Sequence, residues 1–171
     1  IEEPIEYLDT NIMGTVNVLK AMKKNNVKKI IYAASSSCYG IPKKFPTTES
    51  DEIKPMYPYA LSKNLGEQII KHWTKTYKIE FVSLRLFNVY GARSRTNSAY
   101  GAALGVFLKQ KLSNHPFTII GDGKQKRDFI HVDDVVKAFY LSISKSAKNI
   151  ILNIGSGNPH SVLEMVKILK G

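Results

Sequence analysis

Apolar residues recur along this chain with two periods, one typical of helices and one typical of buried strands. Residues 6 to 25 show the helical period, with apolar side chains every three or four positions. These positions are Ile12, Val16, Leu19 and Met22. Two short apolar runs, Ile30–Ala34 and residues 79 to 87, have the length and composition of buried strands. Helices and strands are therefore expected to alternate in the first half of the chain.

A second long helix is expected between these two strands. Pro58 stands where a helix takes its first residue, because the missing N–H costs nothing at that position. The helical pattern then continues to about Tyr77. Residues 40 to 57, which precede this helix, are rich in proline and are expected to form a loop.

The second half of the chain shows the same alternation with shorter elements. The expected elements are a helix near 99 to 113, a strand Phe117–Ile120, a turn at Gly121-Asp122-Gly123, a helix from about Val132, a strand Ile150–Ile154 and a last helix from Ser161. Strands that alternate with helices predict a parallel sheet with helical crossovers. The expected fold class is α/β.

The charge of the chain widens the range of partners to consider. Among 171 residues, 25 are Lys or Arg and 14 are Asp or Glu, which gives a formal net charge of +11. A basic chain suits a polyanion such as nucleic acid, or a small molecule that carries a diphosphate. The lysines are scattered over the expected helix surfaces, which favours a solvated surface over a nucleic-acid-binding face. A basic nucleic-acid-binding module is the alternative from another functional class.

Several other classes of site are disfavoured by composition. Cys38 is the single cysteine, and the four histidines lie far apart, so neither a disulfide framework nor a metal site is expected. The sequence contains no secretory signal and no long apolar run, so a cytoplasmic protein without membrane contact is expected. The chain starts at Ile1 and stops at Gly171 directly after a helical pattern, so both ends are expected to be cut from a longer protein.

Tyr59 and Lys63 are the first candidates for chemistry. Their spacing places both side chains on one face of the expected helix, one turn apart. An ammonium group beside a phenol favours the phenolate, so this pair could transfer a proton. Lowering a phenol pKa from about 10 to about 7 requires roughly 4 kcal/mol, which one lysine and a second positive charge nearby could supply together.

The same spacing occurs at Tyr39 and Lys43. Gly40 and Pro42 lie between these two residues, so they cannot share a regular helix face. This second pair is therefore not expected to transfer protons.

A run of serines, Ser35 to Ser37, follows the strand that ends at Ala34. In an open parallel sheet, ligands bind beyond the carboxyl ends of the strands. A hydroxyl group there could contact a sugar hydroxyl and the Tyr59 phenol. A polar turn that closes the strand explains the serines equally well when they are considered alone.

Five motifs in order resemble the extended short-chain dehydrogenase/reductase family, and within it the NAD-dependent UDP-glucose and UDP-N-acetylglucosamine 4-epimerases. The motifs are Asn11-Ile-Met-Gly14-Thr15, Ala34-Ser35-Ser36-Ser37-Cys-Tyr39-Gly40, Tyr57-Pro58-Tyr59-Ala60-x-Ser62-Lys63, Arg85-Leu86-Phe87-Asn88-Val89-Tyr90-Gly91 and Gly121-Asp122-Gly123-x-x-x-Arg127-Asp128-Phe129-Ile130-His131-Val132-Asp133-Asp134-Val135. Each motif alone is weak evidence, but the five in this order and spacing are specific.

The resemblance implies a role for each matching residue. Tyr59 would take the proton from the sugar 4-hydroxyl, Lys63 would lower the phenol pKa and bind the nicotinamide ribose, and Ser35 would contact both sugar and phenol. Asn11 and the backbone of Phe87 would lie near the NAD cofactor.

On the substrate side, the resemblance implies contacts with a UDP-sugar. Asn88 and Arg127 would bind the sugar nucleotide, with the arginine pairing with its diphosphate, because a guanidinium binds phosphate oxygens bidentately. Thr118 and Ile120 would line the uracil, although a place in the core or on an edge strand explains them nearly as well. His131 and the acids after it are expected to start a helix rather than to catalyse.

The resemblance also divides the chain. Residues 1–93 would be the later part of a Rossmann-type NAD-binding domain with the catalytic residues, and residues 94–171 a substrate-binding region interleaved with a returning strand near 150–154. The glycine-rich turn that holds the pyrophosphate is absent, and Gly155-Ser156-Gly157 is only superficially similar, with His160 at the third glycine position. The chain alone is therefore expected to bind NAD poorly.

The function implied is NAD-dependent 4-epimerisation of a UDP-hexose, by transient oxidation at C4. The nearest alternatives are a 4,6-dehydratase or a decarboxylase on the same scaffold. Those relatives carry acidic residues just after the position of Ser35, where this chain has Ser36 and Ser37, so an epimerase is favoured. The full-length protein is expected to be a homodimer through the helices near 6–25 and 58–77.

Overall fold

The computed structural model describes residues 4–94, 103–144 and 146–170. The chain divides into two compact units. The first unit comprises Ile1–Leu86 and Ala138–Ile154, and the second comprises Phe87–Lys137 and Gly155–Gly171. Helix α5 (Val132–Ser142) begins in the second unit and ends in the first.

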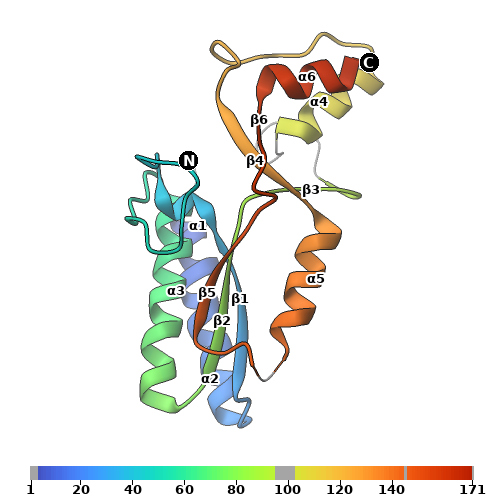
Figure 1. Ribbon diagram of the computed structural model, residues 1–171. Helices are drawn as coiled ribbons and strands as arrows, with labels where there is room; N and C mark the ends of the chain where they lie inside the picture. Colours follow the sequence, from blue (N-terminus) through green and yellow to red (C-terminus); the bar gives the residue numbers. More distant parts are fainter. Residues whose placement is uncertain (1–3, 95–102, 145, 171) are drawn as a thin grey trace. The chain divides into compact units, whose positions relative to one another are not determined.

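The first unit is built on a parallel sheet. Its strands are β1 (Lys29–Ser35), β2 (Glu80–Leu86) and β5 (Ile150–Ile154), in the order β1-β2-β5 (Figure 1). Both pairings are parallel, and Ala34, Arg85 and Asn153 lie in one row across the sheet. This row lies one residue before Ser35, near the carboxyl ends of the strands, where an α/β sheet places its ligands.

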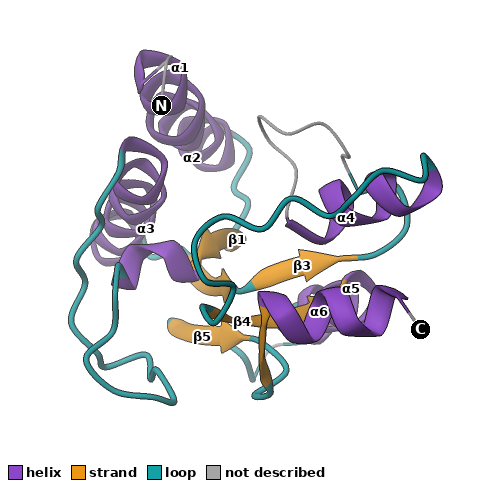
Figure 2. Cartoon of the chain, turned by 90° about the horizontal axis from the view of Figure 1, so that it is seen from above, coloured by secondary structure: helices purple, strands orange, loops and turns teal. Residues whose placement is uncertain are grey.

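Helices cover one face of this sheet. The expected helix at 6–25 consists of α1 (Pro4–Leu8), a π-helical segment η1 (Asp9–Met13) and α2 (Gly14–Lys24). Viewed from above, these helices lie beside α3 (Pro58–Tyr77) on the same side of the sheet (Figure 2). Their contact with the sheet forms the core of the unit, which contains Leu19, Met22, Ile70, Ile79 and Phe81.

Local sequence explains where α3 begins and ends. Tyr57 is extended and precedes Pro58, whose ring suits the first turn of a helix. Lys78 adopts the left-handed conformation and ends the helix after Tyr77. The bounds agree with the expectation from the sequence.

The second unit contains a smaller mixed sheet. Strand β4 (Lys126–His131) pairs in parallel with β3 (Asn88–Tyr90) and antiparallel with β6 (Pro159–Ser161). Helices α4 (Ala103–Leu112) and α6 (Val162–Lys170) pack together. Their shared core contains Phe107, Val162, Met165 and Val166.

The predicted α/β class with a parallel sheet is confirmed, but two details of the second half differ. Residues 117–120, all within the described part of the chain, form no strand. The short strands β3, β4 and β6 were not predicted. Of the helix expected near 99 to 113, Ala103–Leu112 form α4, and residues 99–102 lie outside the described residues.

Among the described residues, none of the helices combines the length and the apolar character needed to span a bilayer.

Candidate active site

Tyr59 and Lys63 lie one turn apart on α3, and both side chains are half-buried. The Tyr59 ring meets the ring of Tyr7 on α1 edge to face, with the centroids 5.8 Å apart. The Lys63 ammonium lies 5.1 Å from the centroid of the Tyr32 ring on β1. The catalytic pair expected from the sequence is therefore held between α1 and the first strand.

Ser35 ends β1 and caps the short 3₁₀ helix η2 (Ser36–Tyr39). Its hydroxyl oxygen accepts the N–H of Ser37 at 3.3 Å and the Ser37 hydroxyl at 2.8 Å. Because the oxygen accepts from Ser37, its own hydrogen remains available for donation to another group. The Ser35 side chain lies close enough to the Tyr59 phenol to lower its pKa, against the larger effect of burial.

The electrostatics of the pair oppose ionisation of the phenol. Burial raises the pKa of Tyr59, while the interaction with Ser35 acts in the opposite direction. Burial also lowers the pKa of Lys63, because a charged ammonium loses hydration there. A phenolate at neutral pH therefore requires an additional positive charge near Tyr59, and a cationic nicotinamide ring would provide one.

Asn11 lies in the π-helical segment η1, where π-turns often mark functional positions. Its carboxamide nitrogen donates to the Ser62 hydroxyl at 2.9 Å, and that hydroxyl donates to the Tyr59 carbonyl at 2.9 Å. The Thr15 hydroxyl donates to the Asn11 carbonyl at 2.6 Å. Asn11 therefore fixes η1 to the first turn of α3, next to the candidate proton-transfer residue.

A fit to NAD can be judged from the donor set of the first unit. A phenol, an ammonium and a hydroxyl come from α3 and from the carboxyl end of β1, which are the groups that bind ribose and sugar hydroxyls. Gly155-Ser156-Gly157, in the second unit, does not offer a phosphate site. Its N–H groups at Ser156 and Gly157 donate to the carboxylate of Asp128 at 2.8 and 2.9 Å.

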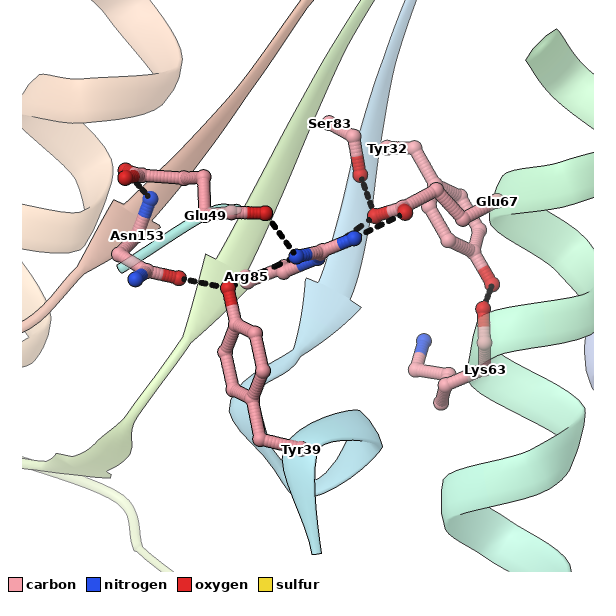
Figure 3. Close-up of polar contacts among 8 residues, drawn as sticks. All are labelled: Tyr32, Tyr39, Glu49, Lys63, Glu67, Ser83, Arg85 and Asn153. Atoms are coloured by element: carbon pink, nitrogen blue, oxygen red, sulfur yellow. Dashed lines mark hydrogen bonds and ion pairs between the residues drawn. The ribbon is translucent and has the colours of Figure 1, made fainter. Parts of the chain in front are cut away.

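Sequence reasoning did not identify a buried polar network in the first unit (Figure 3). Its central members are Arg85 on β2, Glu67 on α3 and Tyr39 in η2. Two signals pointed to it: Arg85 is charged within an apolar strand pattern, and Glu67 follows Lys63 by one helical turn.

The second unit contains the other predicted residues. Phe87 precedes β3, and Asn88 begins it. The Asn88 amide donates to the carbonyl of Asp128 at 2.9 Å, so it contacts the neighbouring strand β4. Arg127 lies exposed on β4, and its guanidinium donates to the Lys126 carbonyl at 2.9 Å.

Thr118 and Ile120 lie in an irregular segment instead of the predicted strand. The Thr118 N–H donates to the side-chain oxygen of Gln110 at 3.2 Å, and the Gln110 amide donates to the Thr118 hydroxyl at 2.9 Å. A side chain of α4 thus supplies bonds that a neighbouring strand would otherwise provide. Ile120 is 82% exposed, so it does not serve the core.

The structure therefore divides the predicted residues between the two units. Ser35, Tyr59, Lys63 and Asn11 belong to the first unit, and Phe87, Asn88, Thr118, Ile120 and Arg127 belong to the second. Within residues 4–94, 103–144 and 146–170, no group of three metal-binding side chains comes together.

Comparison with known families gives one match over most of the chain. Residues 1–155 match the model of the NAD dependent epimerase/dehydratase family. A protein of Methanocaldococcus jannaschii, provisionally named a UDP-glucose 4-epimerase, is 40% identical over 171 residues, which are 99% of this chain and 55% of that protein.

Solved structures agree with this match. The UDP-glucose 4-epimerase of Thermotoga maritima with UDP-glucose superposes with a TM-score of 0.95 at 33% identity, covering 99% of this chain and 55% of that one. The UDP-N-acetylglucosamine 4-epimerase of Methanobrevibacter ruminantium in complex with UDP-N-acetylmuramic acid gives 0.93 at 36% identity, covering 98% and 54%. The chain spans about half the length of the relatives it matches.

Proposed function

The chain belongs to the NAD dependent epimerase/dehydratase family, and from this membership we propose that the complete protein is an NAD-dependent 4-epimerase of a UDP-hexose. The observation that carries the proposal is the arrangement of Tyr59 one turn before Lys63 on α3, with the phenol ring against Tyr7 of α1 and the ammonium over the Tyr32 ring of β1. A phenol beside an ammonium group suits proton exchange with a sugar hydroxyl. Ser35 lies at the carboxyl end of β1, where parallel sheets bind their ligands.

The four candidate residues of the first unit have separate roles in the proposed reaction. NAD, when bound, accepts a hydride from the sugar and returns it. The Tyr59 phenol oxygen takes the proton of the sugar 4-hydroxyl and gives it back. The Lys63 ammonium binds a ribose hydroxyl of the cofactor and favours the phenolate, and the Ser35 hydroxyl holds the sugar oxygen at Tyr59. Asn11 keeps the first turn of α3 in place through Ser62.

The residues of the second unit are proposed to hold the nucleotide. The Arg127 guanidinium would pair with the diphosphate, because it is exposed and its planar fork matches phosphate oxygens. Asn88 would contact the sugar nucleotide. Thr118 and the exposed Ile120 would line the uracil, and Phe87 would place its backbone near the nicotinamide.

The proposal is tested by the Tyr59→Phe substitution in the complete protein. We expect kcat for conversion of UDP-glucose to UDP-galactose to fall by a factor of about 10² or more, because the variant cannot transfer the proton. The conversion is followed by separating the two nucleotide sugars. Substitution of Tyr57 by Phe, also at the start of α3, is the matched control and should leave kcat within about threefold. Near-normal turnover by Tyr59→Phe would refute the assignment.

The same assay separates an epimerase from a dehydratase or decarboxylase. An elimination needs an acid near the Ser35 hydroxyl, and the two residues that follow are Ser36 and Ser37. The Ser37 hydroxyl donates a hydrogen bond to the Ser35 hydroxyl oxygen at 2.8 Å, and an alcohol hydroxyl is too weak an acid to replace a carboxylic acid. A 4-keto-6-deoxy sugar formed from UDP-glucose, or carbon dioxide released from a UDP-hexuronic acid in a parallel assay, would overturn the epimerase proposal in favour of these alternatives.

A homodimer through α1, α2 and α3 is the accompanying proposal. Three large apolar side chains on these helices are exposed, Val18 by 52%, Leu61 by 42% and Leu65 by 36%. Exposed apolar side chains that lie together are typical of surfaces that bind another protein. Light scattering on the complete protein should give twice the monomer mass. Replacing Leu61 and Leu65 with glutamate should give the monomer mass.

A further inference from the structure

A buried ion pair lies on the helix that carries the candidate catalytic pair. Arg85 on β2 and Glu67 on α3 are 3% and 2% exposed. Arg85 donates through Nη2 and Nε to the two carboxylate oxygens of Glu67, at 2.6 and 3.1 Å. The Ser83 hydroxyl donates to the same carboxylate at 2.7 Å. The carboxylate is therefore held by three donors from one strand, in the bidentate geometry that guanidinium groups favour.

The remaining guanidinium nitrogen of Arg85 reaches the segment that follows Ser35. Nη1 donates to the Tyr39 phenol oxygen at 2.7 Å and to the Glu49 carbonyl at 3.3 Å. The Tyr39 hydroxyl donates to the side-chain oxygen of Asn153 on β5 at 2.7 Å (Figure 3). One guanidinium thus joins α3, two strands and the 3₁₀ helix that Ser35 caps.

Glu67 shares a helix face with the candidate catalytic residues. Tyr59, Lys63 and Glu67 follow one another at intervals of four residues, so each side chain lies on the same side of α3 as the next one, one turn further along. Because a helix is rigid over two turns, an anchor at Glu67 limits the rotation and sliding of α3 against the sheet. The directions of the Tyr59 and Lys63 side chains are then fixed by that anchor.

Ser35 is fixed through the other end of the network. Tyr39 is the last residue of η2, and its hydroxyl lies between Arg85 and Asn153. Because Ser35 caps the same short helix, the position of Tyr39 determines where the Ser35 hydroxyl points.

Stability alone does not account for such a network. Burying a charged pair costs hydration, and apolar residues of the same size often hold a core together equally well. What the network supplies is a fixed geometry between two segments that are far apart in the sequence. We propose that Glu67, Arg85 and Tyr39 are positioning residues that set the distance and direction between the Ser35 hydroxyl and the Tyr59 phenol. Their part in turnover, though not in the geometry, rests on the proposed 4-epimerase function.

The test uses the complete protein with Tyr39→Phe and Glu67→Gln. Each removes one link of the network while keeping the size of the side chain. The matched control is Ile70→Val, which trims a fully buried residue of α3 outside the network. We expect kcat to fall by about 10- to 100-fold in the two network variants, as for a displaced catalytic group. KM should change by less than about threefold, because the substrate contacts are not altered. Ile70→Val should lower the melting temperature and leave kcat near wild type.

A second measurement does not depend on turnover. Tyrosine labelled with ¹³C at the phenol carbon allows each ring to be titrated by NMR, and Tyr59 is identified by the signal lost in Tyr59→Phe. We expect the pKa of Tyr59 to shift in Tyr39→Phe and in Glu67→Gln, because its contact with Ser35 changes. The pKa should stay at the wild-type value in Ile70→Val.

The two measurements distinguish failure of the positioning proposal from failure of the proposed function. A wild-type protein without epimerase activity, whose Tyr59 titration still shifts in both network variants, would refute the function and support the positioning role. Wild-type kcat and an unshifted Tyr59 titration in Tyr39→Phe would overturn the positioning role. A loss of kcat in Ile70→Val equal to that in Tyr39→Phe would also overturn it, since destabilisation alone would explain both. If Glu67→Gln does not fold, Tyr39→Phe, which loses a single hydroxyl, decides the outcome.

Discussion

Gly66 on α3 lies where three segments of the first unit approach one another. A methyl group on this residue would stand 2.4 Å from the Tyr32 hydroxyl oxygen and 3.1 Å from the carbonyl oxygen of Asn11. The first contact is an overlap, and the second is with backbone that cannot move freely. Gly66 lies in the regular part of the helix, so no unusual backbone conformation requires a glycine there. The glycine is needed because its neighbours leave no room for a side chain.

Gly66→Ala should destabilise the protein although alanine is the better helix former. We expect the free energy of unfolding to fall by about 1–3 kcal/mol, because overpacking outweighs the gain in helix propensity of about 1 kcal/mol. Gly14→Ala is the control, since the nearest atom to its added methyl group is the Asp9 carbonyl oxygen at an ordinary 3.8 Å. That variant should be neutral or slightly more stable. Urea unfolding measures both, and equal effects would contradict the steric argument.

Tyr32 should make the stability of the fold depend on alkaline pH. Burial raises the pKa of this phenol from 10.0 to about 12. Since the folded pKa lies above the unfolded one, the stabilisation is complete below pH 10 and is lost as the pH rises toward 12. We expect a loss of about 1 kcal/mol between pH 9 and 11, after allowance for solvent screening.

The measurement compares urea unfolding of wild type and Tyr32→Phe at these two pH values. The variant should be less stable at pH 9, because it lacks the hydrogen bond from the Tyr32 hydroxyl to the Lys63 carbonyl. It should lose less stability than wild type between pH 9 and 11, since no phenol ionises at this position. Equal losses in the two proteins would show that another group titrates.

The candidate catalytic residues could be predicted from the sequence, but the buried network beside them could not. Tyr59 and Lys63 could be predicted because a helix makes their spacing a local property. Arg85 bonds Glu67 and Tyr39 across 18 and 46 residues, and no local pattern reports such contacts. Tyr39 has the same spacing to Lys43 but shares no helix face with it, and Lys43 pairs with Glu52 at 3.7 Å. Nothing in this local pattern predicts that Tyr39 belongs to the buried network.

At the scale of elements, α6 begins with a reciprocal cap. The Ser161 N–H donates to the Glu164 carboxylate at 2.7 Å, and the Glu164 N–H donates to the Ser161 hydroxyl at 3.1 Å. Two N–H groups at the start of the helix are satisfied by this capping box. The bond from the Ser161 backbone holds the pKa of Glu164 below its usual value.

Ser161→Ala should therefore lower the free energy of unfolding by about 1 kcal/mol near neutral pH. Because the folded pKa of Glu164 is lowered, its contribution is present above the unfolded pKa and is lost as the pH falls through the folded pKa. The Ser161 N–H that the carboxylate accepts is kept in Ser161→Ala, so the pH dependence is tested by Glu164→Gln. The difference in stability between wild type and Glu164→Gln should shrink as the pH falls through the folded pKa of Glu164. Ser113→Ala, at an exposed position after α4, is the control and should have little effect. An unchanged difference between wild type and Glu164→Gln at low pH would rule out the carboxylate as a partner in the cap.

Elements with strong local patterns were predictable, and elements that depend on pairing were not. The bounds of α3 followed from Pro58 and the helical period, and β2 followed from its apolar run. Strand β4 is mostly polar, and it is a strand because β3 and β6 pair with it. For residues 117–120 the local pattern is misleading, because the apolar residues predict a strand that the structure does not contain. The hydrogen bonds of this segment go to Gln110 of α4 instead.

At the scale of the whole molecule, the net charge of +11 needs an explanation that the family membership does not supply. Lysines occupy the last turns of α2, α3, α4 and α6. A positive side chain there interacts favourably with the negative end of the helix dipole and with the unpaired carbonyl groups. Part of the positive charge therefore has a local structural role in each helix, and it is distributed over separate elements.

This distribution predicts weak and non-specific binding to nucleic acid. A protein that binds DNA through one basic face neutralises many phosphates, and its affinity falls by a factor of about 10³ or more between 50 and 200 mM salt. Lysines at separate helix ends reach few phosphates at once, so we expect a fall below about 100-fold over this range. Fluorescence anisotropy with labelled duplex DNA measures the slope, and the same titration of the complete protein with a UDP-sugar provides the comparison. A steep DNA slope together with no UDP-sugar binding would favour a nucleic-acid-binding module over the proposed epimerase.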